Sequence, residues 1–402
     1  MRILFVSPFV PYPLTDGGRQ RVARLLDALI DHHEVVFCGL TRNNEAEAKW
    51  PTTKRLILPP ILARVDVPNA RGDAPALGQA ARVPWWARSK GLARVERSGL
   101  WELVSALPLS NIDAVHVETS LMAPLGVALK AIRPGLKLVL DLHDIVWHLK
   151  AQALRQNRRV LSIDTVRRMF NVTQTFLLDT RMSRQFDKIL VCSEIDRKRL
   201  SRSVPDERIV IVPNCTDIAA TVEPAPSDSR RLVFVGSMSY SPNEKAVMWF
   251  CHNVLPLVHR ALPDAEFWIV GKSPSESVRR LSALRGVHVT GEVSDVQPYL
   301  QQAAVVVAPL LTAGGTRLKI LEAMAAQRPV IATSIGAEGI DVVASRDLLL
   351  ADDATAFAAG CVRLIQDVAF RTRIASAGRA LVIERYDWTR AQARLLACYS
   401  NL

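Results

Sequence analysis

The stretch GGTRLKILEAMAAQRPVIAT (residues 314–333) is the most informative part of the sequence for predicting the fold. It follows the apolar run VVVAPLL, opens with two glycines, and continues with apolar residues at helical spacing, among them Leu318 and Leu321. The helical pattern ends at Arg328 and Pro329, and a β-branched run follows at once. A buried strand, a glycine loop, a helix and a second buried strand together form one unit of a parallel sheet covered by helices.

The same alternation runs through both halves of the chain. It predicts strands at residues 2–7, 34–40, 55–58, 114–118, 137–142, 188–193 and 208–213, and again at 231–236, 266–271, 287–291, 304–309, 329–333 and 347–351. Between the two sets, residues 217–229 are rich in Pro, Ala, Ser and Asp and are interpreted as a linker. The predicted fold class is α/β, with two doubly wound Rossmann-like parallel-sheet domains, 1–216 and 217–385, facing each other across a cleft. Such sheets bind ligands at the carboxyl ends of their strands, so the cleft is the expected site.

The composition is that of a globular chain, since 49% of the 402 residues are apolar and 22% are charged. No window reaches 18 uncharged apolar residues, and Pro8, Pro11 and Pro13 interrupt the first apolar run, which favours a buried strand over a leader or a membrane span. The six cysteines form no C-x-x-C pair, which is typical of a reducing compartment and argues against a disulfide framework or a zinc site. A cytoplasmic location is expected.

The charge is uneven along the chain. Residues 1–210 contain 32 lysines and arginines against 21 acidic residues, whereas residues 211–402 contain 19 against 18. A basic half beside a neutral half predicts two domains with different partners. A basic surface can bind nucleic acid, an anionic membrane or a phosphorylated substrate.

The opening stretch also predicts an anion site. Arg317 and Lys319 lie in the first turn of the expected helix, with Thr316 as its N-cap. Cations are disfavoured there by the helix dipole unless an anion is bound. A diphosphate fits, with Glu322 one turn further on to accept hydrogen bonds from a ribose diol; the alternative is a solvated charged face.

A second glycine pair, Gly17 and Gly18, follows Asp16 where the first strand leads into a helix. Bare backbone at a helix N-terminus lets N–H groups approach an anion closely. A plain turn and cap is an equally good interpretation of this pair.

Several motifs together resemble those of the retaining GT-B glycosyltransferases of family four. They are, in chain order, the Gly-Gly loop after the first strand, HVETSLMAP, DLHD, VCSEIDRKRL, IVPN, FVGSM, GEVSDVQPYL and the opening stretch, and they cover nearly the whole chain. The resemblance implies transfer of a hexose-type sugar from a nucleotide-diphosphate sugar held by the C-terminal domain to an acceptor held by the N-terminal domain. It also implies that the final helix, about residues 386–402, packs back on the N-terminal domain.

The resemblance assigns donor-site residues position by position. Glu322 matches the glutamate that holds the ribose, whereas Gly314 stands where the family has a further glutamate that holds the sugar. Gly236, Ser237 and Met238 replace the family's Gly-Arg-Leu, which removes its phosphate-binding arginine, and Lys245 is a candidate for the lysine that follows. Arg317 and Lys319 are interpreted as substitutes for that arginine. The remaining donor-side candidates are backbone or loop positions: Gly291, Val293, Gly315 and Thr316.

On the N-terminal side, His143 in LDLHDIV matches the family histidine that contacts the donor sugar near the reacting carbon. His116 and Glu118 are candidates to line the acceptor side, and Asp144 is interpreted as a capping residue. No D-x-D motif is present, so no metal or other cofactor is expected, and cations and helix dipoles would neutralise the leaving diphosphate. In such enzymes the leaving phosphate is thought to accept the acceptor's proton, so no protein nucleophile is named.

The acceptor is expected to be lipid-linked or an envelope or exopolysaccharide glycan. The reason is a basic, aromatic segment with the composition of a membrane-surface helix. It contains Trp85, Trp86 and Trp101 among Arg82, Arg88, Lys90, Arg94 and Arg97.

The sequence leaves three rival functions to consider. A nucleotide-sugar 2-epimerase shares the layout but requires additional catalytic acids, which the sequence does not reveal. A non-catalytic nucleotide-sugar-binding subunit is suggested by Gly314 in place of a glutamate. A nucleic-acid binder is suggested only by the net charge of +12, and no recognised binding motif supports it, so nucleic acid is not an expected partner.

Overall fold

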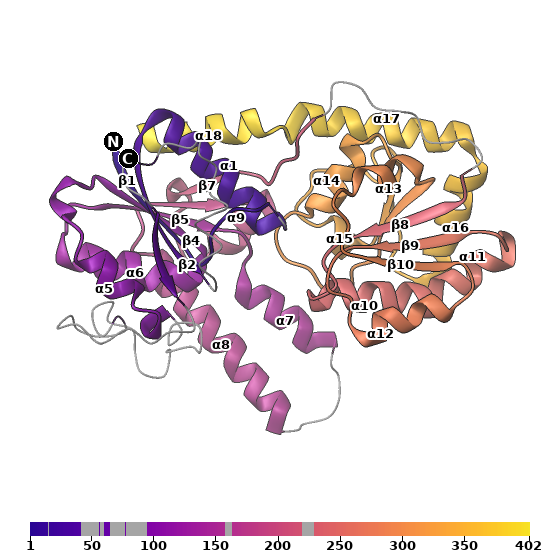
Figure 1. The fold of residues 1–402 in the computed structure, drawn as a ribbon, viewed down its shortest axis with the longest axis horizontal. Helices are drawn as coiled ribbons and strands as arrows, with labels where there is room; N and C mark the ends of the chain where they lie inside the picture. The colour runs from indigo at the N-terminus through magenta and orange to yellow at the C-terminus, as the bar shows by residue number, and fades with distance from the viewer. Residues whose placement is uncertain are drawn as a thin grey trace. The chain divides into compact units, whose positions relative to one another are not determined.

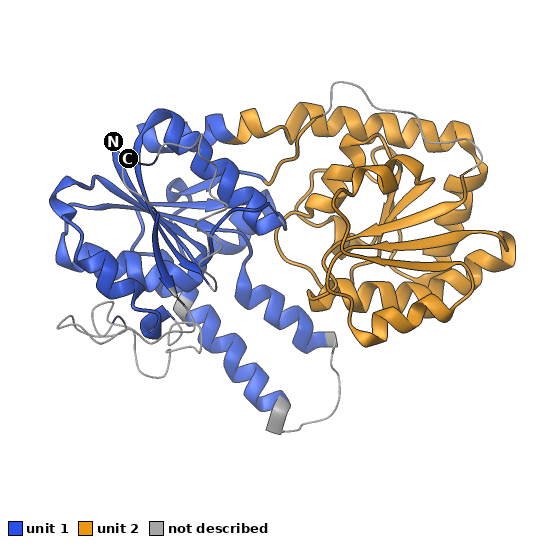
Figure 2. Ribbon diagram, viewed as in Figure 1, with its two compact units in different colours: residues 1–213, 392–402 blue, residues 214–391 orange. Residues whose placement is uncertain are grey.

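The computed structural model describes residues 1–14, 16–41, 56, 60–64, 77, 95–156, 163–218 and 229–402. It divides into two compact units, coloured blue and orange in Figure 2. Unit 1 comprises Met1–Pro213 and Gln392–Leu402, and unit 2 comprises Asn214–Ala391. The C-terminal residues therefore belong to the same unit as the N-terminus.

Unit 1 is a parallel sheet of seven strands in the order β3-β2-β1-β4-β5-β6-β7. The strands are β1 (Arg2–Ser7), β2 (Glu34–Thr41), β3 (Ile61–Arg64), β4 (Ala114–Glu118), β5 (Lys137–Leu142), β6 (Lys188–Val191) and β7 (Ile209–Ile211). The α-helices are α1 (Gly17–His32), α5 (Leu100–Ser105), α6 (Thr119–Ile132), α7 (Val146–Gln156), α8 (Ile163–Ser183) and α9 (Glu194–Leu200), together with the end of α18 (Trp388–Ser400). Short 3₁₀ turns occupy Leu109–Asn111 and Asp206–Arg208.

The sheet of unit 1 is buried on both faces, which explains its continuous apolar strands. One face, with Val115 and Val117 of β4, packs against α5 and α6 in a single apolar cluster. The alternate residues of the same strands, such as Phe5, point to the other face, where α1 presents Val22 and Leu26. Loops, rather than helices, follow directly on the carboxyl ends of most strands at this edge of the sheet.

Unit 2 is a parallel sheet of six strands in the order β10-β9-β8-β11-β12-β13. The strands are β8 (Arg231–Val235), β9 (Glu266–Val270), β10 (Val287–Gly291), β11 (Val305–Ala308), β12 (Val330–Ala332) and β13 (Leu349–Leu350). The α-helices are α10 (Ser241–Trp249), α11 (Leu255–Ala261), α12 (Glu276–Arg280), α13 (Gln297–Gln302), α14 (Leu318–Ala325), α15 (Ser334–Ala337), α16 (Ala354–Gln366) and α17 (Val368–Arg385). A π-helical turn (Phe250–Val254) joins α10 to α11, and a 3₁₀ turn (Leu281–Ala283) follows α12.

The helices of unit 2 again cover both faces of its sheet (Figure 1). α10, α11 and α16 contribute Val247, Val258 and Phe357 to one apolar core with the strands. The short helix α14 buries Ile320, Leu321 and Met324. Both units are thus doubly wound α/β layers, and the predicted fold class is confirmed.

Most predicted strands are confirmed within one or two residues at each end. The predicted strand at 55–58 lies outside the described residues except for Leu56, which is not in a strand, and β3 at Ile61–Arg64 occupies the edge of the sheet instead. Of the predicted linker, residues 219–228 lie outside the described part of the chain. None of the helices described combines the length and the apolar character needed to cross a membrane.

The predicted membrane segment lies largely outside the described residues, including Trp85, Trp86 and the cations Arg82, Arg88, Lys90 and Arg94. Within the described part, Trp101 is only 1% exposed and packs in the core of unit 1, so its interpretation as a membrane anchor is wrong. The physical reason is that α5 places it among the buried leucines and valines beside β2 and β3.

Candidate functional site

In unit 1, acidic and histidine side chains gather at the carboxyl ends of β4 and β5. β4 ends at Glu118, and Asp141 of β5 lies opposite Glu118 in the strand register. Because side chains alternate along a strand, His116 lies on the same face as Glu118. His143 directly follows the end of β5. This edge is where parallel α/β sheets bind ligands, so these four residues form the candidate site of unit 1.

The four side chains are joined by hydrogen bonds and an ion pair. The Nε2 atom of His143 lies 2.6 Å from Oε2 of Glu118 and 3.5 Å from Oδ2 of Asp141. Arg21 of α1 donates to both oxygens of Asp141, at 2.8 and 2.7 Å, and to the backbone oxygen of Val212 at 2.8 Å. The fork of a guanidinium matches a carboxylate in this two-point geometry. Arg21 therefore ties α1 to the edge of the sheet.

The electrostatics of the group favour a charged histidine beside a charged carboxylate. Burial raises the pKa of Glu118, but attraction to His143 and hydrogen bonds from His116 and His143 outweigh it and lower the pKa to about 2. Burial lowers the pKa of His143, but attraction to Glu118 and the hydrogen bond between them outweigh it, so the pKa is raised. Glu118 is thus ionised at neutral pH, and His143 binds a proton more readily than a free histidine.

His143 presents its other nitrogen toward the start of α1. A Cβ atom added to Gly18 would lie 3.8 Å from Nδ1 of His143, and the His143 side chain is 16% exposed. α1 begins at Gly17, and Asp16 caps it by accepting from the N–H of Arg19 at 3.0 Å. The structure thus brings together Gly18 and His143, which were predicted from separate motifs. A helix N-terminus beside a histidine suits a negatively charged or hydroxylated ligand.

His116 and Glu118 do not line a surface, which corrects their interpretation as acceptor-side residues. Both side chains are 0% exposed. The Nε2 atom of His116 lies 3.1 Å from Oε1 of Glu118, and its Nδ1 atom lies 2.7 Å from the hydroxyl of Tyr399. Their alternating positions on β4 direct them beneath α18 rather than outward, so they can act on a ligand only through His143.

Within the described part of the chain, one group of three side chains has ligand atoms close enough to hold a metal ion. The atoms belong to His116, Glu118 and Asp141, and all lie within 4.8 Å of one another. Each is already engaged, however: Asp141 binds Arg21, and Glu118 binds two histidines. A cation placed there would meet the guanidinium of Arg21 at close range. These donors fit a hydrogen-bonded network better than a metal site, and metal independence stays a prediction.

In unit 2, Lys319 of α14 is held at the carboxyl ends of the strands. Its Nζ atom donates to Oδ1 of Asn243 at 2.7 Å and lies 3.9 Å from the centroid of the Phe234 ring. Burial, followed by repulsion from Arg317, lowers the pKa of Lys319 to about 7, although Glu322 opposes the shift. A lysine that is only partly charged before a ligand arrives gains an interaction when an anion binds.

Bare backbone borders Lys319. A Cβ atom added to Gly236, at the end of β8, would lie 2.7 Å from Nζ of Lys319. A Cβ atom on Gly271, at the end of β9, would lie 2.0 Å from the carbonyl oxygen of Gly236. Gly291 ends β10 with φ +72, and a Cβ atom there would meet nothing within 4 Å. The ends of three adjacent strands therefore lack side chains, and the first of them borders Lys319, an arrangement that admits a phosphate close to the backbone.

Arg317 is buried against backbone carbonyl oxygens, an arrangement that favours a structural role over its predicted role as a catalytic cation. It is 7% exposed, and its guanidinium donates to the carbonyl oxygens of Gly314, Gly315 and Ile335. It also occupies the N-cap position of α14, so the prediction that Thr316 is the N-cap is wrong. Arg317 thus ties the glycine loop to α15 through backbone carbonyl oxygens.

The other donor-side candidates differ in their exposure and in their hydrogen-bond partners. Lys245 is exposed, and the buried Asn243, two residues before it on α10, is the residue that reaches Lys319. Glu322 is partly buried on α14, and Thr316 is buried, its backbone oxygen lying 3.3 Å from Nδ2 of Asn214. The hydroxyl of Ser237 bonds that of Ser239 at 2.8 Å, and Val293 is partly exposed.

Sequence reasoning missed Arg21, Asp141, Asn243, Gly271 and Tyr399. An arginine on the apolar stripe of α1, between Val22 and the start of the helix, was a usable signal, because an unpaired cation is rarely buried. Asp141 precedes His143 by two residues and could have been grouped with it. Nothing local marks Tyr399, which lies 283 residues from His116.

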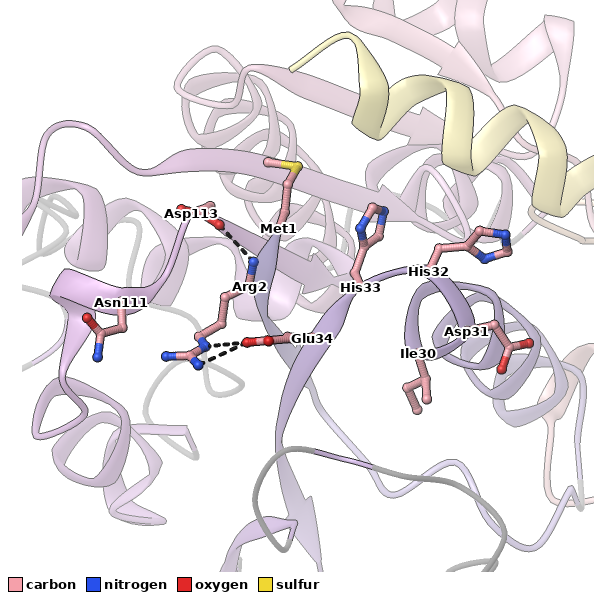
Figure 3. Close-up of a pocket in the computed structure, with 9 residues that line it drawn as sticks. All are labelled: Met1, Arg2, Ile30, Asp31, His32, His33, Glu34, Asn111 and Asp113. Atoms are coloured by element: carbon pink, nitrogen blue, oxygen red, sulfur yellow. Dashed lines mark hydrogen bonds and ion pairs between the residues drawn. The ribbon is translucent and has the colours of Figure 1, made fainter.

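A pocket of about 670 Å³ in unit 1 lies elsewhere (Figure 3). Its lining includes Met1, Glu34 and Asp113, which stand at the amino ends of β1, β2 and β4. Arg2 crosses it, with its backbone N–H bound to Asp113 and its guanidinium bound to Glu34 (Figure 3). Because ligands of parallel sheets bind at the opposite, carboxyl edge, this pocket is not the candidate site.

Two family models match most of the chain. The model described as glycosyl transferase 4-like domain matches residues 16–215, and the model described as glycosyl transferases group 1 matches residues 229–367. The first covers the network around His143, and the second covers Lys319 and its glycines. The chain belongs to the group 1 glycosyltransferases.

The relatives that match in sequence are distant. An uncharacterised 44.6 kDa protein in the cps region of Klebsiella pneumoniae is 26% identical over 39% of this chain and 42% of its own length. A phosphatidyl-myo-inositol mannosyltransferase of Mycolicibacterium smegmatis is 27% identical over 48% and 52%. The chain thus spans about half the length of the curated relatives it matches.

Solved structures extend the similarity in fold to the whole chain. The sucrose-phosphate synthase of Thermosynechococcus elongatus superposes with a TM-score of 0.74 at 18% identity, over 100% of this chain and 98% of that one. Anabaena HepE in complex with UDP and glucose gives 0.69 at 16% identity, over 100% of both chains.

Proposed function

We propose that the protein is a retaining hexosyltransferase that uses a nucleotide-diphosphate sugar as donor. The observation that carries the proposal is Lys319, held by Asn243 beside side-chain-free strand ends at Gly236 and Gly271. This arrangement supports binding of a diphosphate, with Glu322 one helical turn away to accept from the ribose. That HepE was solved with UDP and glucose supports a uridine nucleotide as the first donor to test.

His143 would act at the sugar end of the donor. Its Nε2 atom is committed to Glu118, which leaves Nδ1 for a sugar hydroxyl or a phosphate oxygen near the reacting carbon. In the proposed reaction, the bond from C1 of the sugar to the phosphate oxygen breaks and a bond from C1 to the acceptor oxygen forms on the same face. The acceptor's proton passes to the leaving phosphate. Lys319 would supply positive charge where the diphosphate gains negative charge, so the proposal needs no metal.

The acceptor is proposed to be lipid-linked or an envelope polysaccharide, reached from the cytoplasmic face of a membrane. The names of the two relatives, one from a cps region and one acting on phosphatidyl-myo-inositol, support this choice. α8 provides a surface for the contact, because it carries a stripe of exposed apolar side chains. They are Val166, Met169, Phe170, Phe176 and Leu177, between 36% and 59% exposed.

The charge of α8 matches an anionic lipid surface. Arg167, Arg168 and Arg181 are exposed on the same helix, whereas Asp179 is only 8% exposed. α8 pairs with α7 and extends away from the sheet of unit 1 (Figure 1). An apolar stripe flanked by arginines is typical of helices that lie in a membrane interface.

A panel of nucleoside diphosphates and nucleotide sugars tests the proposal through the melting temperature, which ligands of the folded state raise. A uridine or other nucleotide sugar should stabilise the wild-type protein, and Lys319→Ala should lose most of that shift. Absence of any shift across the panel would overturn the donor assignment.

Product analysis separates the alternatives. Free nucleoside diphosphate and a glycoside would support transfer. An isomerised nucleotide sugar would indicate a 2-epimerase. Tight nucleotide binding without turnover would indicate a non-catalytic subunit, the alternative that Gly314 in place of a glutamate keeps open.

A further inference from the structure

The C-terminal helix contributes a side chain to the network behind His143. Tyr399 of α18 is 2% exposed, and its hydroxyl lies 2.7 Å from Nδ1 of His116. His116 in turn contacts Glu118, and Glu118 contacts His143. A continuous chain of hydrogen bonds therefore runs from α18 to the ring that faces Gly18.

The carboxylate of Glu118 fixes the direction of the two hydrogen bonds that it accepts. An ionised carboxylate only accepts, so both histidines donate to Glu118, each from its Nε2 atom and each to a different oxygen. A neutral His116 that donates from Nε2 must accept at Nδ1. The hydroxyl of Tyr399 is the donor to that atom, and burial raises the pKa of Tyr399 well above its usual value, so the hydroxyl keeps its proton.

Packing holds the hydrogen-bonded rings of His116 and Tyr399 in this single arrangement. The ring of His116 stacks on Phe5, its neighbour in the strand register, with centroids 4.5 Å apart and planes 10° from parallel. The ring of Tyr399 lies against His33, with centroids 5.7 Å apart. His116 can therefore change its hydrogen bonds only by changing tautomer, and the hydroxyl of Tyr399 selects the tautomer that donates to Glu118.

We propose that Tyr399 is a positioning residue that acts through His116 and Glu118 to fix which ring nitrogen of His143 faces the substrate. With both oxygens of Glu118 occupied, the carboxylate cannot rotate without breaking a buried hydrogen bond, so Nε2 of His143 stays inward and Nδ1 stays at the Gly18 side. The functional part of the inference rests on the proposed role of His143 in sugar transfer. The positioning itself can be measured without any turnover.

Tyr399→Phe tests the inference by removing one hydroxyl and keeping the ring. The matched control is Tyr386→Phe in unit 2, because Tyr386 is also buried at 5% exposure and its hydroxyl accepts from the N–H of Asp341 at 2.7 Å. Both substitutions remove one hydrogen bond of 2.7 Å made by the hydroxyl of a buried tyrosine, so both should lower the melting temperature.

Nitrogen NMR of the histidine rings gives the readout that a merely structural role would not move. In Tyr399→Phe, Glu118 loses part of its donation from His116 and becomes more basic, so the pKa of His143 should rise and its ring, no longer held against a fixed carboxylate, should sample the flipped orientation. Arg21 and Asp141, the other charged groups beside His143, are unchanged in this variant. Tyr386→Phe should leave both signals as in the wild type.

Kinetics complete the test. Tyr399→Phe should lower kcat about 10-fold, less than the roughly 100-fold that a misplacement of about 1 Å in an active site can cost, with the donor KM nearly unchanged. His116→Phe should do the same, and the double variant should be no worse than either single one. Unaltered His143 signals in Tyr399→Phe would overturn the positioning role even if the protein proved not to be a transferase. Altered His143 signals with unchanged kcat would instead show that His143 has another role.

Discussion

Nζ of Lys319 donates to Oδ1 of Asn243 at 2.7 Å, a contact between residues 76 positions apart that joins α14 to α10. Asn243 is itself fixed, because its Nδ2 atom donates to the backbone oxygen of Ser237 at 2.8 Å. The side chain of Lys319 is thus held in place before any ligand binds. Little reorganisation of the site is needed for it to stabilise a negative charge.

Lys319→Ala should reduce turnover by about 100-fold or more, the scale seen when one preorganised electrostatic group is removed. Lys319→Arg should restore it only in part, because a guanidinium differs in shape and reach. Arg280→Ala is the control, since Arg280 is an exposed cation on α12 of the same unit. Steady-state kinetics of the three variants check the assignment, and wild-type turnover in Lys319→Ala would place the diphosphate elsewhere.

Binding of a nucleoside diphosphate should take up a proton near neutral pH. Burial holds the pKa of Lys319 at about 7, so the free protein has a partly neutral lysine, whereas a bound diphosphate raises that pKa and draws a proton in. Affinity should therefore fall as pH rises above 7. Calorimetry in buffers of different ionisation enthalpy measures the uptake, which should shrink in Lys319→Ala. Equal uptake in both proteins would point to another group.

Glu322→Gln should weaken ribose recognition and raise the KM for the donor more than it lowers kcat. A deoxyribonucleotide donor should lose much of its disadvantage in this variant, because the missing hydroxyl no longer leaves an ionised acceptor without its donor. The ratio of kcat/KM for the two donors, compared between wild type and variant, is the measurement. An unchanged ratio would separate Glu322 from the ribose.

His143→Ala should lower kcat strongly and leave nucleoside diphosphate affinity nearly unchanged, because the proposed diphosphate ligands lie in unit 2. Turnover assays and calorimetry on the same preparation separate the two effects. Loss of affinity in parallel with turnover would indicate that the histidine serves the structure of the site rather than the sugar.

Binding to anionic vesicles should depend on salt and on the exposed stripe of α8. Each basic residue near such a surface contributes about 1 kcal/mol at low salt. Phe170→Ser should reduce co-sedimentation, whereas Ile383→Ser, at an exposed apolar position on α17, should not. Equal binding to neutral and anionic vesicles, or no effect of salt, would contradict a membrane role.

The sequence was sufficient to predict the elements because each strand is a short, nearly continuous apolar run. It also located the carboxyl-edge residues Gly18, His143 and Lys319, since strand ends followed by glycine or histidine are visible locally. What it could not predict are pairings set by tertiary contact. The direction of Arg317 depends on nearby carbonyls, and the partners of Asp141 and Lys319 lie 120 and 76 residues away.

Gly271 limits how the donor site can be varied. A side chain at this position would have to occupy the place of the Gly236 carbonyl, so substitution here should displace two strand ends at once, whereas a side chain at Gly236 would displace the side chains of Asn243 and Lys319. Gly291 offers open space but holds φ +72, a conformation that asparagine and aspartate tolerate better than other residues with a side chain. A library aimed at altered donor choice should therefore keep positions 236 and 271 as glycine and sample small polar residues at 291.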